Sequence, residues 1–131
     1  MKFSTRAEYG LRAIIHLDPK AKKSVSLAKI ANLEKLSLSY LERLFSAFRK
    51  AGIVRADLGV SGGYYLTRPA GKINVFEVIE AVEGSLAPFS CVDEKKKGCS
   101  VCHCRISPIW GKLYKQIKHT LSSMKLNELM K

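Results

Sequence analysis

The segment from Ser39 to Gly52 constrains the fold more than any other part of this chain. It begins with Ser39-Tyr40-Leu41-Glu42, which has the Ser-x-x-Glu form of a helix capping box. Apolar side chains then recur at the three- and four-residue spacing of one helix face: Leu41, Leu44, Phe45 and Phe48. Gly52 follows, and glycine readily takes the left-handed conformation that ends a helix. The pattern predicts an amphipathic helix that ends just before Gly52.

Two further helices are expected before this one. Thr5-Arg6-Ala7-Glu8 is a second capping box, and the apolar residues after it predict a helix from about Arg6 to Leu17. Pro19 and a lysine-rich stretch interrupt that helix. A short second helix is then expected to end near residues 33–34, with an apolar face at Leu27, Ile30 and Ala31.

A β-hairpin is expected after the third helix. Ile53-Val54 and Tyr64-Tyr65-Leu66 are rich in β-forming residues, and between them lie Gly59 and Gly62-Gly63, whose backbone freedom suits a hairpin tip. Three helices followed by a hairpin form a winged helix-turn-helix. The predicted fold class is therefore mainly α with a small β-hairpin wing.

The rest of the chain predicts a fourth helix, a loop and a long C-terminal helix. Asn74 caps the fourth helix and Gly84 closes it. Pro108 suits the first turn of the last helix, whose narrow apolar stripe consists of Trp110, Leu113, Ile117, Thr120 and Met124. We expect this stripe to form a homodimer interface, and packing on the first helix is the alternative. The expected domains are a DNA-binding unit at 1–84, a cysteine-rich loop at 85–105 and a dimerisation helix and tail at 106–131.

The charge of the chain indicates a polyanionic partner. Lysine and arginine number 23 against 11 acidic residues, a formal net charge of +12 over 131 residues. Double-stranded DNA is the expected partner, and an anionic membrane surface is the rival that charge alone leaves open. No stretch approaches the roughly 18 apolar residues of a membrane span, and the charged N-terminus does not suit a signal peptide. We expect a cytoplasmic protein.

The third helix supplies the candidate DNA-reading residues, because the N-terminal part of this helix enters the major groove in helix-turn-helix proteins. Arg43 is the best candidate for a base contact, since a guanidinium can donate to guanine O6 and N7 together. Ser37 and Ser39 either contact DNA or cap the helix. The full candidate set is Ser37, Ser39, Tyr40, Arg43, Arg49 and Lys50, together with Ser61, Gly62 and Gly63 at the hairpin tip.

The four cysteines of the chain lie within fourteen residues, at Cys91, Cys99, Cys102 and Cys104. Thiolates this crowded in a reducing compartment indicate zinc or an iron–sulfur cluster. The spacing offers one Cys-x-x-Cys pair, whereas a structural zinc site normally uses two, and it differs from the ferredoxin run. No hydrolytic triad or phosphate-binding glycine loop occurs, so we expect no enzymatic activity and no small-molecule substrate.

Five separated motifs in this chain resemble the Rrf-two family of bacterial transcription regulators. They are residues 1–13, Leu36–Phe45, Lys50–Val54, Gly62-Gly63-Tyr64, and Cys104 placed six residues before Trp110. The resemblance runs from Met1 to about Leu129. It implies a homodimer that binds a palindromic operator. Because the chain has Leu58-Gly59-Val60 where many members carry an arginine before the wing tip, a minor-groove arginine is not carried over.

The resemblance also implies a cluster, usually two-iron two-sulfur, held by three loop cysteines and a fourth ligand. Cys91 and Cys104 match the outer ligands, and the middle ligand is Cys99 or the extra thiol Cys102. Some members use a histidine three residues past the last cysteine, where this chain has Ser107. Others use an acidic residue of the first helix, of the same or the partner subunit, at a position matching Glu8. The alternatives are that Glu8 serves only the capping box and that all four cysteines are ligands. The expected function is a transcription repressor whose operator binding responds to the cluster. One alternative is a constitutive DNA-binding regulator with a structural zinc ion or no metal, and another is a small redox or electron-transfer protein.

Overall fold

The first three helices each begin at a serine whose hydroxyl accepts a backbone amide. The computed structural model describes residues 2–59, 62–94 and 105–130. In it α1 (Thr5–Ile14), α2 (Leu27–Glu34) and α3 (Leu38–Lys50) are capped by Ser4, Ser26 and Ser37. Each serine Oγ accepts from an amide of the first turn at 3.2 Å. The chain therefore enters each helix with one otherwise unpaired amide satisfied.

The two predicted capping boxes were wrong in position. Ser4 rather than Thr5 caps α1, and its amide and hydroxyl also donate to the carboxylate of Glu83 at the end of the fourth helix. Ser37 rather than Ser39 caps α3. The first helix also ends earlier than expected, at Ile14, because the amides of residues 16 and 17 bond to carbonyls three residues back, in a tight turn.

The predicted end signals were confirmed at Gly52 and Gly84, which have φ of +77° and +82°. The fourth helix, α4 (Val75–Glu83), begins at Asn74, whose Oδ1 accepts from the Glu77 amide at 2.9 Å. The second helix ends at Glu34, as expected, and the next residue, Lys35, is left-handed with φ of +54°.

The hairpin consists of the antiparallel strands β1 (Val54–Asp57) and β2 (Gly63–Leu66). Val54 pairs with Leu66 and Asp57 with Gly63, so the inward side chains of both strands cover α3. Outside the strands, Val25 pairs with Tyr64 through two backbone hydrogen bonds of 2.9 Å. This bridge joins the segment before α2 to the outer edge of the hairpin.

The main core lies between α1, α3 and α4. Its largest fully buried side chains are Phe45, Phe48, Ile14, Ile30 and Leu41. Phe45 and Phe48 meet edge to face, with ring centroids 5.4 Å apart. A Cβ at Gly10 of α1 would lie 3.2 Å from the Phe48 ring, so the glycine lets the two helices approach closely. The winged helix-turn-helix predicted from the sequence is the observed architecture.

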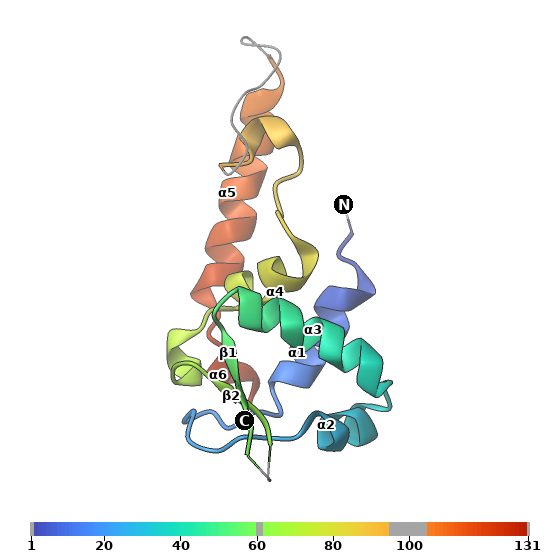
Figure 1. The fold of residues 1–131 in the computed structure, drawn as a ribbon. Helices are drawn as coiled ribbons and strands as arrows, with labels where there is room; N and C mark the ends of the chain where they lie inside the picture. The colour runs from blue at the N-terminus through green and yellow to red at the C-terminus, as the bar shows by residue number, and fades with distance from the viewer. Residues whose placement is uncertain (1, 60–61, 95–104, 131) are drawn as a thin grey trace.

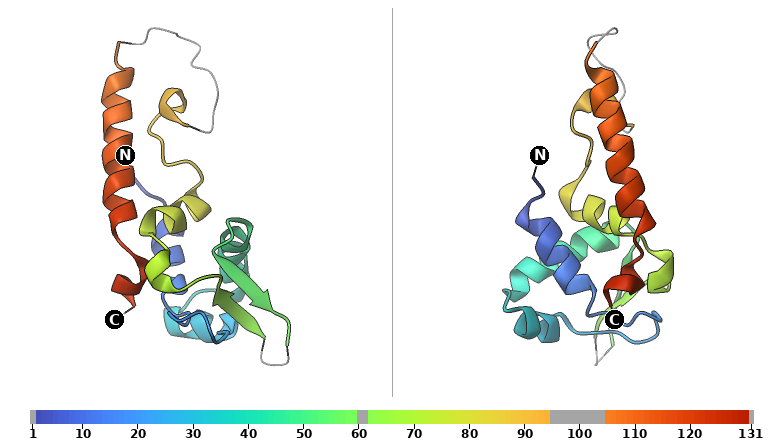
Figure 2. Two further views of the ribbon diagram at one scale, coloured as in Figure 1. Left: turned by 90° about the vertical axis from the view of Figure 1, so that its left-hand side faces the viewer. Right: turned by 180° about the vertical axis from the view of Figure 1, so that it is seen from behind.

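The long helix α5 (Ser107–Ser123) rises from this body, with the short helix η2 (Ser90–Val92) beside it (Figure 1). The middle of α5 packs on α4 through Tyr114, which is 7 % exposed. The chain then returns to the body: the Met124 carbonyl accepts from the Val75 amide at 2.9 Å, and Leu126 of α6 (Leu126–Leu129) is fully buried beside η1 (Ala70–Lys72). Figure 2 shows the hairpin and α2 at the end opposite to η2.

Candidate nucleic-acid interface and cysteine segment

The helix α3 buries one face and exposes the other. Leu41, Leu44, Phe45 and Phe48 lie in the core, whereas the predicted contact residues Ser37, Ser39, Arg43, Arg49 and Lys50 are exposed. Because the apolar face fixes the helix on the body, the polar face is presented to solvent as a rigid surface. This is the geometry of a recognition helix.

The structure separates the roles of the predicted residues at the start of α3. The Ser37 hydroxyl is committed to the cap, while the Ser39 hydroxyl is exposed and 3.5 Å from it. Tyr40 is half-buried, and its ring meets Tyr9 of α1 edge to face at 6.1 Å between centroids. Arg43 is exposed and lines a shallow hollow of about 270 Å³ together with Arg6 of α1. Arg6 is a cation beside the recognition helix that sequence reasoning missed.

The predicted glycines of the hairpin have a packing reason as well. A Cβ at Gly63 would lie 2.3 Å from the Val25 carbonyl oxygen, a separation that only glycine avoids. The Tyr64 ring packs on Phe45 with centroids 5.1 Å apart, so Tyr64 fastens the hairpin to α3. Arg55 lies on the outward face of β1, opposite Tyr65, and is exposed. The predicted contact at Ser61 lies outside the described residues.

Of the four predicted cysteine ligands, only Cys91 lies in the part of the chain that the structure describes. Cys91 is half-buried within η2, whereas Cys99, Cys102 and Cys104 lie outside the described residues. Among the residues that are described, no group of three or more His, Cys, Asp or Glu side chains could hold a metal ion. Glu8 is exposed on α1, and its carboxylate accepts from Arg12 at 2.9 Å.

The residues before and after Cys91 are attached to α5. The Phe89 ring stacks at a tilt on Trp110 with centroids 4.8 Å apart, and Val92 lies against Gly111. Lys118 donates to Glu94 at 3.2 Å and sits over the Phe76 ring. The next described residue after Glu94 is Arg105, which directly precedes α5. Residues 89–94, which include Cys91, are therefore held against α5.

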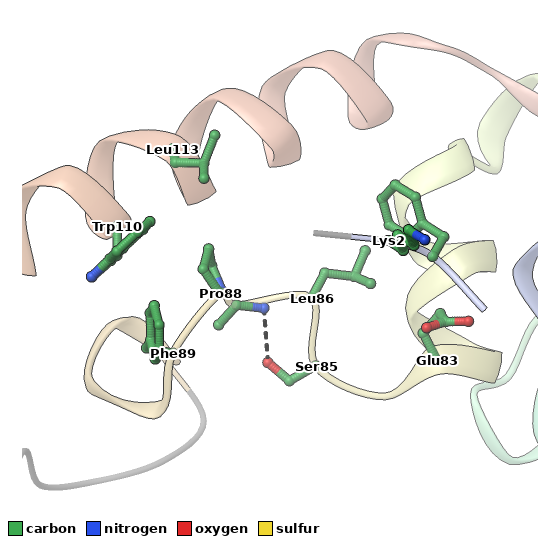
Figure 3. A pocket seen from close by; sticks show the side chains of 10 residues that line it. Lys2, Glu83, Ser85, Leu86, Pro88, Phe89, Trp110 and Leu113 are labelled. Carbon is green, nitrogen blue, oxygen red and sulfur yellow. Dashed lines mark hydrogen bonds between the residues drawn. The ribbon is translucent and has the colours of Figure 1, made fainter.

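A hollow of about 450 Å³ lies between the N-terminus, the segment after α4 and α5 (Figure 3). Trp110 and Leu113 of the predicted dimer stripe line it, facing Pro88 and Phe89 of the same chain. Phe3 and Phe89 in its wall are about half exposed. Part of the predicted stripe thus packs toward its own chain.

The remaining stripe residues divide in the same way. Thr120 is exposed and Ile117 is half-buried, whereas Met124 lies beyond the end of α5 and packs beside α4. Two isoleucines that sequence reasoning missed, Ile106 and Ile109, are 55 % and 59 % exposed. Their spacing could have indicated them, because Ile106 and Ile109 extend the predicted residues Leu113 and Ile117 toward the start of the helix at three- and four-residue steps.

A helix-turn-helix with an exposed cationic recognition helix and an adjacent hairpin defines a winged-helix DNA-binding protein. Comparison with known proteins gives the family. Residues 3–131 match the model of the Rrf2 (Rrf-two) family, described as an iron-dependent transcriptional regulator. The chain belongs to this family of transcription regulators, which are not enzymes.

Relatives and solved structures agree with this assignment. The chain is 34 % identical over 132 residues to protein rrf2 of Nitratidesulfovibrio vulgaris, covering 100 % of this chain and 88 % of that protein. It is 38 % identical over 133 residues to the transcriptional regulator IscR of Xenorhabdus nematophila, covering 100 % and 80 %.

Among solved structures, CymR, the global cysteine regulator of B. subtilis, superimposes with a TM-score of 0.77 at 30 % identity, over 99 % of this chain and 96 % of that one. IscR of T. potens gives 0.74 at 34 % identity, over 99 % and 86 %. The protein is therefore a DNA-binding transcription regulator of this type. Within the described ranges, no helix is both long and apolar enough to span a membrane.

Proposed function

We propose that this protein is a cytoplasmic homodimeric repressor whose operator binding responds to an iron–sulfur cluster held by residues 91–104. The observation that carries the proposal is the packing of the described part of this segment, around Cys91, on α5. η2, with Cys91, packs on α5, and α5 packs on α4, the helix that also contacts α3. A change in the cysteine segment therefore has a continuous packed route to the recognition helix.

Cys91, Cys99 and Cys104 are the proposed cysteine ligands, with Cys102 as the alternative to Cys99. The donor set fits the cofactor, because thiolates are the protein ligands that iron–sulfur clusters use, and the described member, Cys91, is only half-buried. When bound, a two-iron two-sulfur cluster would supply a group sensitive to oxygen, nitric oxide or iron supply. The cysteine ligands would hold the cluster, and the bound cluster would fix the segment of chain between these cysteines.

Glu8 is the proposed fourth ligand, and in this arrangement it comes from the second subunit. Within one chain, α1 packs on α2, α3 and α4, whereas η2 packs on α5, and the views of Figures 1 and 2 show α1 and η2 apart. Glu8 is exposed and forms an ion pair with Arg12. As a cluster ligand, its carboxylate would bind iron in place of the Arg12 guanidinium.

The proposed dimer interface is the exposed apolar face of α5. Ile106, Ile109 and Leu113 are each more than a third exposed. A large apolar surface at the end of a projecting helix favours burial against a second copy, with the same residues on both sides of a two-fold axis. Leu113, Ile117 and Thr120 of the predicted stripe continue this face. Trp110 and Met124 support it from within their own chain.

Two subunits related by a two-fold axis would place two α3 helices on a palindromic operator. Arg43 and Ser39 are the proposed base-contacting residues, with Ser37 and Tyr40 positioned behind them. Arg49, Lys50 and the hairpin residues Ser61, Gly62 and Gly63 are proposed to meet phosphates. In this proposal residues 1–84 bind DNA, residues 85–105 hold the cluster and residues 106–131 form the dimer.

The experiment begins with iron, acid-labile sulfide and zinc analysis on protein purified without oxygen. About two irons and two sulfides per subunit, with a visible spectrum bleached by air, are expected. Duplexes selected from a random pool then report binding with and without the cluster. Stoichiometric zinc that persists in air, or no metal after reconstitution, would contradict the cluster proposal.

Variants assign the ligands. Cys91→Ser and Glu8→Ala should each lower cluster content or its lifetime in air, and comparison of Cys99→Ser with Cys102→Ser identifies the middle ligand. Ser90→Ala is the matched control, because it changes the same short helix without removing a thiol. A Cys91→Ser protein with wild-type iron and sulfide would remove Cys91 from the site.

A further inference from the structure

The segment between α1 and α2 carries a group of cations that the recognition helix and hairpin do not include. Residues 18–24, called here the lysine loop, contain Lys20, Lys22 and Lys23, and all three side chains are exposed. A run of exposed lysines is often only a solvated surface. Two features of this loop, its fixed shape and its position beside the hairpin, indicate a binding surface.

The backbone of the lysine loop is fixed by one carboxylate. Asp18 accepts from the backbone amides of Lys20, Lys22 and Lys23 at 3.0, 3.2 and 3.0 Å. These hydrogen bonds, the one from Lys20 first, hold the pKa of Asp18 below its ordinary value. Ala21 takes a left-handed conformation with φ of +58° to complete the turn. The three lysines therefore project from a built turn, and the carboxylate among them is occupied by backbone donors.

The lysine loop is also fixed relative to the hairpin. At one end the Pro19 carbonyl accepts from the Ala70 amide at 2.9 Å, and at the other the Val25–Tyr64 bridge joins the chain to β2. Lys22 shares a hollow of about 510 Å³ with Asp57 and Tyr65 of the hairpin. Figure 1 and the right-hand view of Figure 2 show this loop and α2 on opposite sides of the hairpin, at the same end of the molecule.

The charge of this corner is positive. Arg55 on the outward face of β1 adds a fourth exposed cation to the three lysines. Two carboxylates oppose them: Asp18, which accepts the loop amides, and Asp57, whose Oδ1 accepts from the Gly59 amide at 3.2 Å. Phosphates spaced along a DNA strand fit such a group of separate, exposed ammonium ions.

We propose that the lysine loop binds the DNA backbone beside the groove that the hairpin contacts, and so extends the contact surface of each subunit past the winged helix. This inference rests on the proposed DNA-binding function. Lysine contacts to phosphate carry no sequence information, so the loop would raise affinity for every duplex and set the salt dependence of binding, while α3 sets the preferred sequence.

The test compares two double variants that remove the same charge. Lys22→Gln/Lys23→Gln changes the lysine loop, and Lys112→Gln/Lys115→Gln changes exposed lysines on α5, away from the hairpin. Affinity for a selected duplex and for a random-sequence duplex is measured from low to moderate salt. At about 0.9 per phosphate contact, the loop variant should flatten the slope of log K against log salt by about 2 per bound subunit.

The loop variant should keep the affinity ratio between the two duplexes, and hydroxyl-radical footprints should lose protection at backbone positions on the hairpin side. The α5 variant should keep both slope and footprint. Equal slopes for the two variants and the wild type would overturn the inference. So would a loop variant that binds DNA normally but loses binding to phosphatidylserine-containing vesicles, since the loop would then serve a membrane. If the wild-type protein prefers no duplex at all, the proposed function fails instead.

Discussion

The substitution Gly63→Ala tests how tightly the hairpin is joined to the segment before α2. A Cβ at this position would lie 2.3 Å from the Val25 carbonyl oxygen and 2.8 Å from the Ser26 nitrogen. Both atoms belong to the backbone, so the clash is relieved only if the hairpin and this segment separate. Separation breaks the two hydrogen bonds of 2.9 Å between Val25 and Tyr64. At about 0.5–1.5 kcal/mol per bond, the free energy of unfolding should fall by about 1–3 kcal/mol.

Urea unfolding followed by circular dichroism measures this loss, at one protein concentration because association would shift the apparent stability. Gly59→Ala is the matched control in the same hairpin. Among the described residues, its Cβ would meet nothing closer than Asp57 Oδ1 at 3.4 Å, and Gly59 is not among the described glycines with positive φ. That variant should stay within about 0.5 kcal/mol of the wild type. If Gly63→Ala is as stable as Gly59→Ala, the hairpin accommodates the methyl group freely and the reasoning is refuted.

Three further substitutions test the helix cap, the core and the loop carboxylate. Ser37→Ala should lower the free energy of unfolding by about 1 kcal/mol because it removes the cap of α3, whereas Ser39→Ala should change it little; urea midpoints compare the two. Phe48→Ala should cost about 3–5 kcal/mol, because the ring is fully buried; an unchanged urea midpoint would contradict the core assignment. Asp18→Ala should destabilise the protein at neutral pH. Because the native pKa of Asp18 lies below its ordinary value of 3.8, the difference from wild type should persist above that pH and disappear as pH falls through the native pKa. A difference that is independent of pH would exclude the carboxylate as its source.

The core of the winged helix was predictable because it rests on local patterns that agree with one another. The apolar spacing from Leu41 to Phe48 predicted the buried face of α3, and Gly52 predicted its end. The hairpin followed from β-forming residues on either side of glycines. In each case neighbouring residues carry the full signal, so no knowledge of distant contacts was needed.

The errors arose where distant contacts decide between similar local signals. Ser4 and Thr5 are both acceptable caps, and contact with Glu83, nearly eighty residues away, accompanies the choice of Ser4. A contact within the chain also bears on the α5 stripe. Trp110 was predicted to lie at the dimer interface, and Phe89 of the same chain stacks on it, a contact that the spacing along one helix does not reveal. The sequence correctly predicted an interruption between α1 and α2 at Pro19 and the lysines, but it did not show that Asp18 accepts three backbone amides there and fixes the turn.

The helix α4 lies between the winged helix and α5 and packs on both. One face meets the core of the winged helix, where Val82 lies against Gly10 and Val78 is fully buried. The other meets α5, where Phe76 and Ile79 pack with Tyr114. Interiors packed this closely transmit a displacement of one helix to its neighbours. A shift of α5 at its cysteine end would therefore reach α1 and α3 through α4, and in a dimer it would change the spacing of two recognition helices. Operator affinity depends steeply on that spacing, because each helix must meet its own half-site.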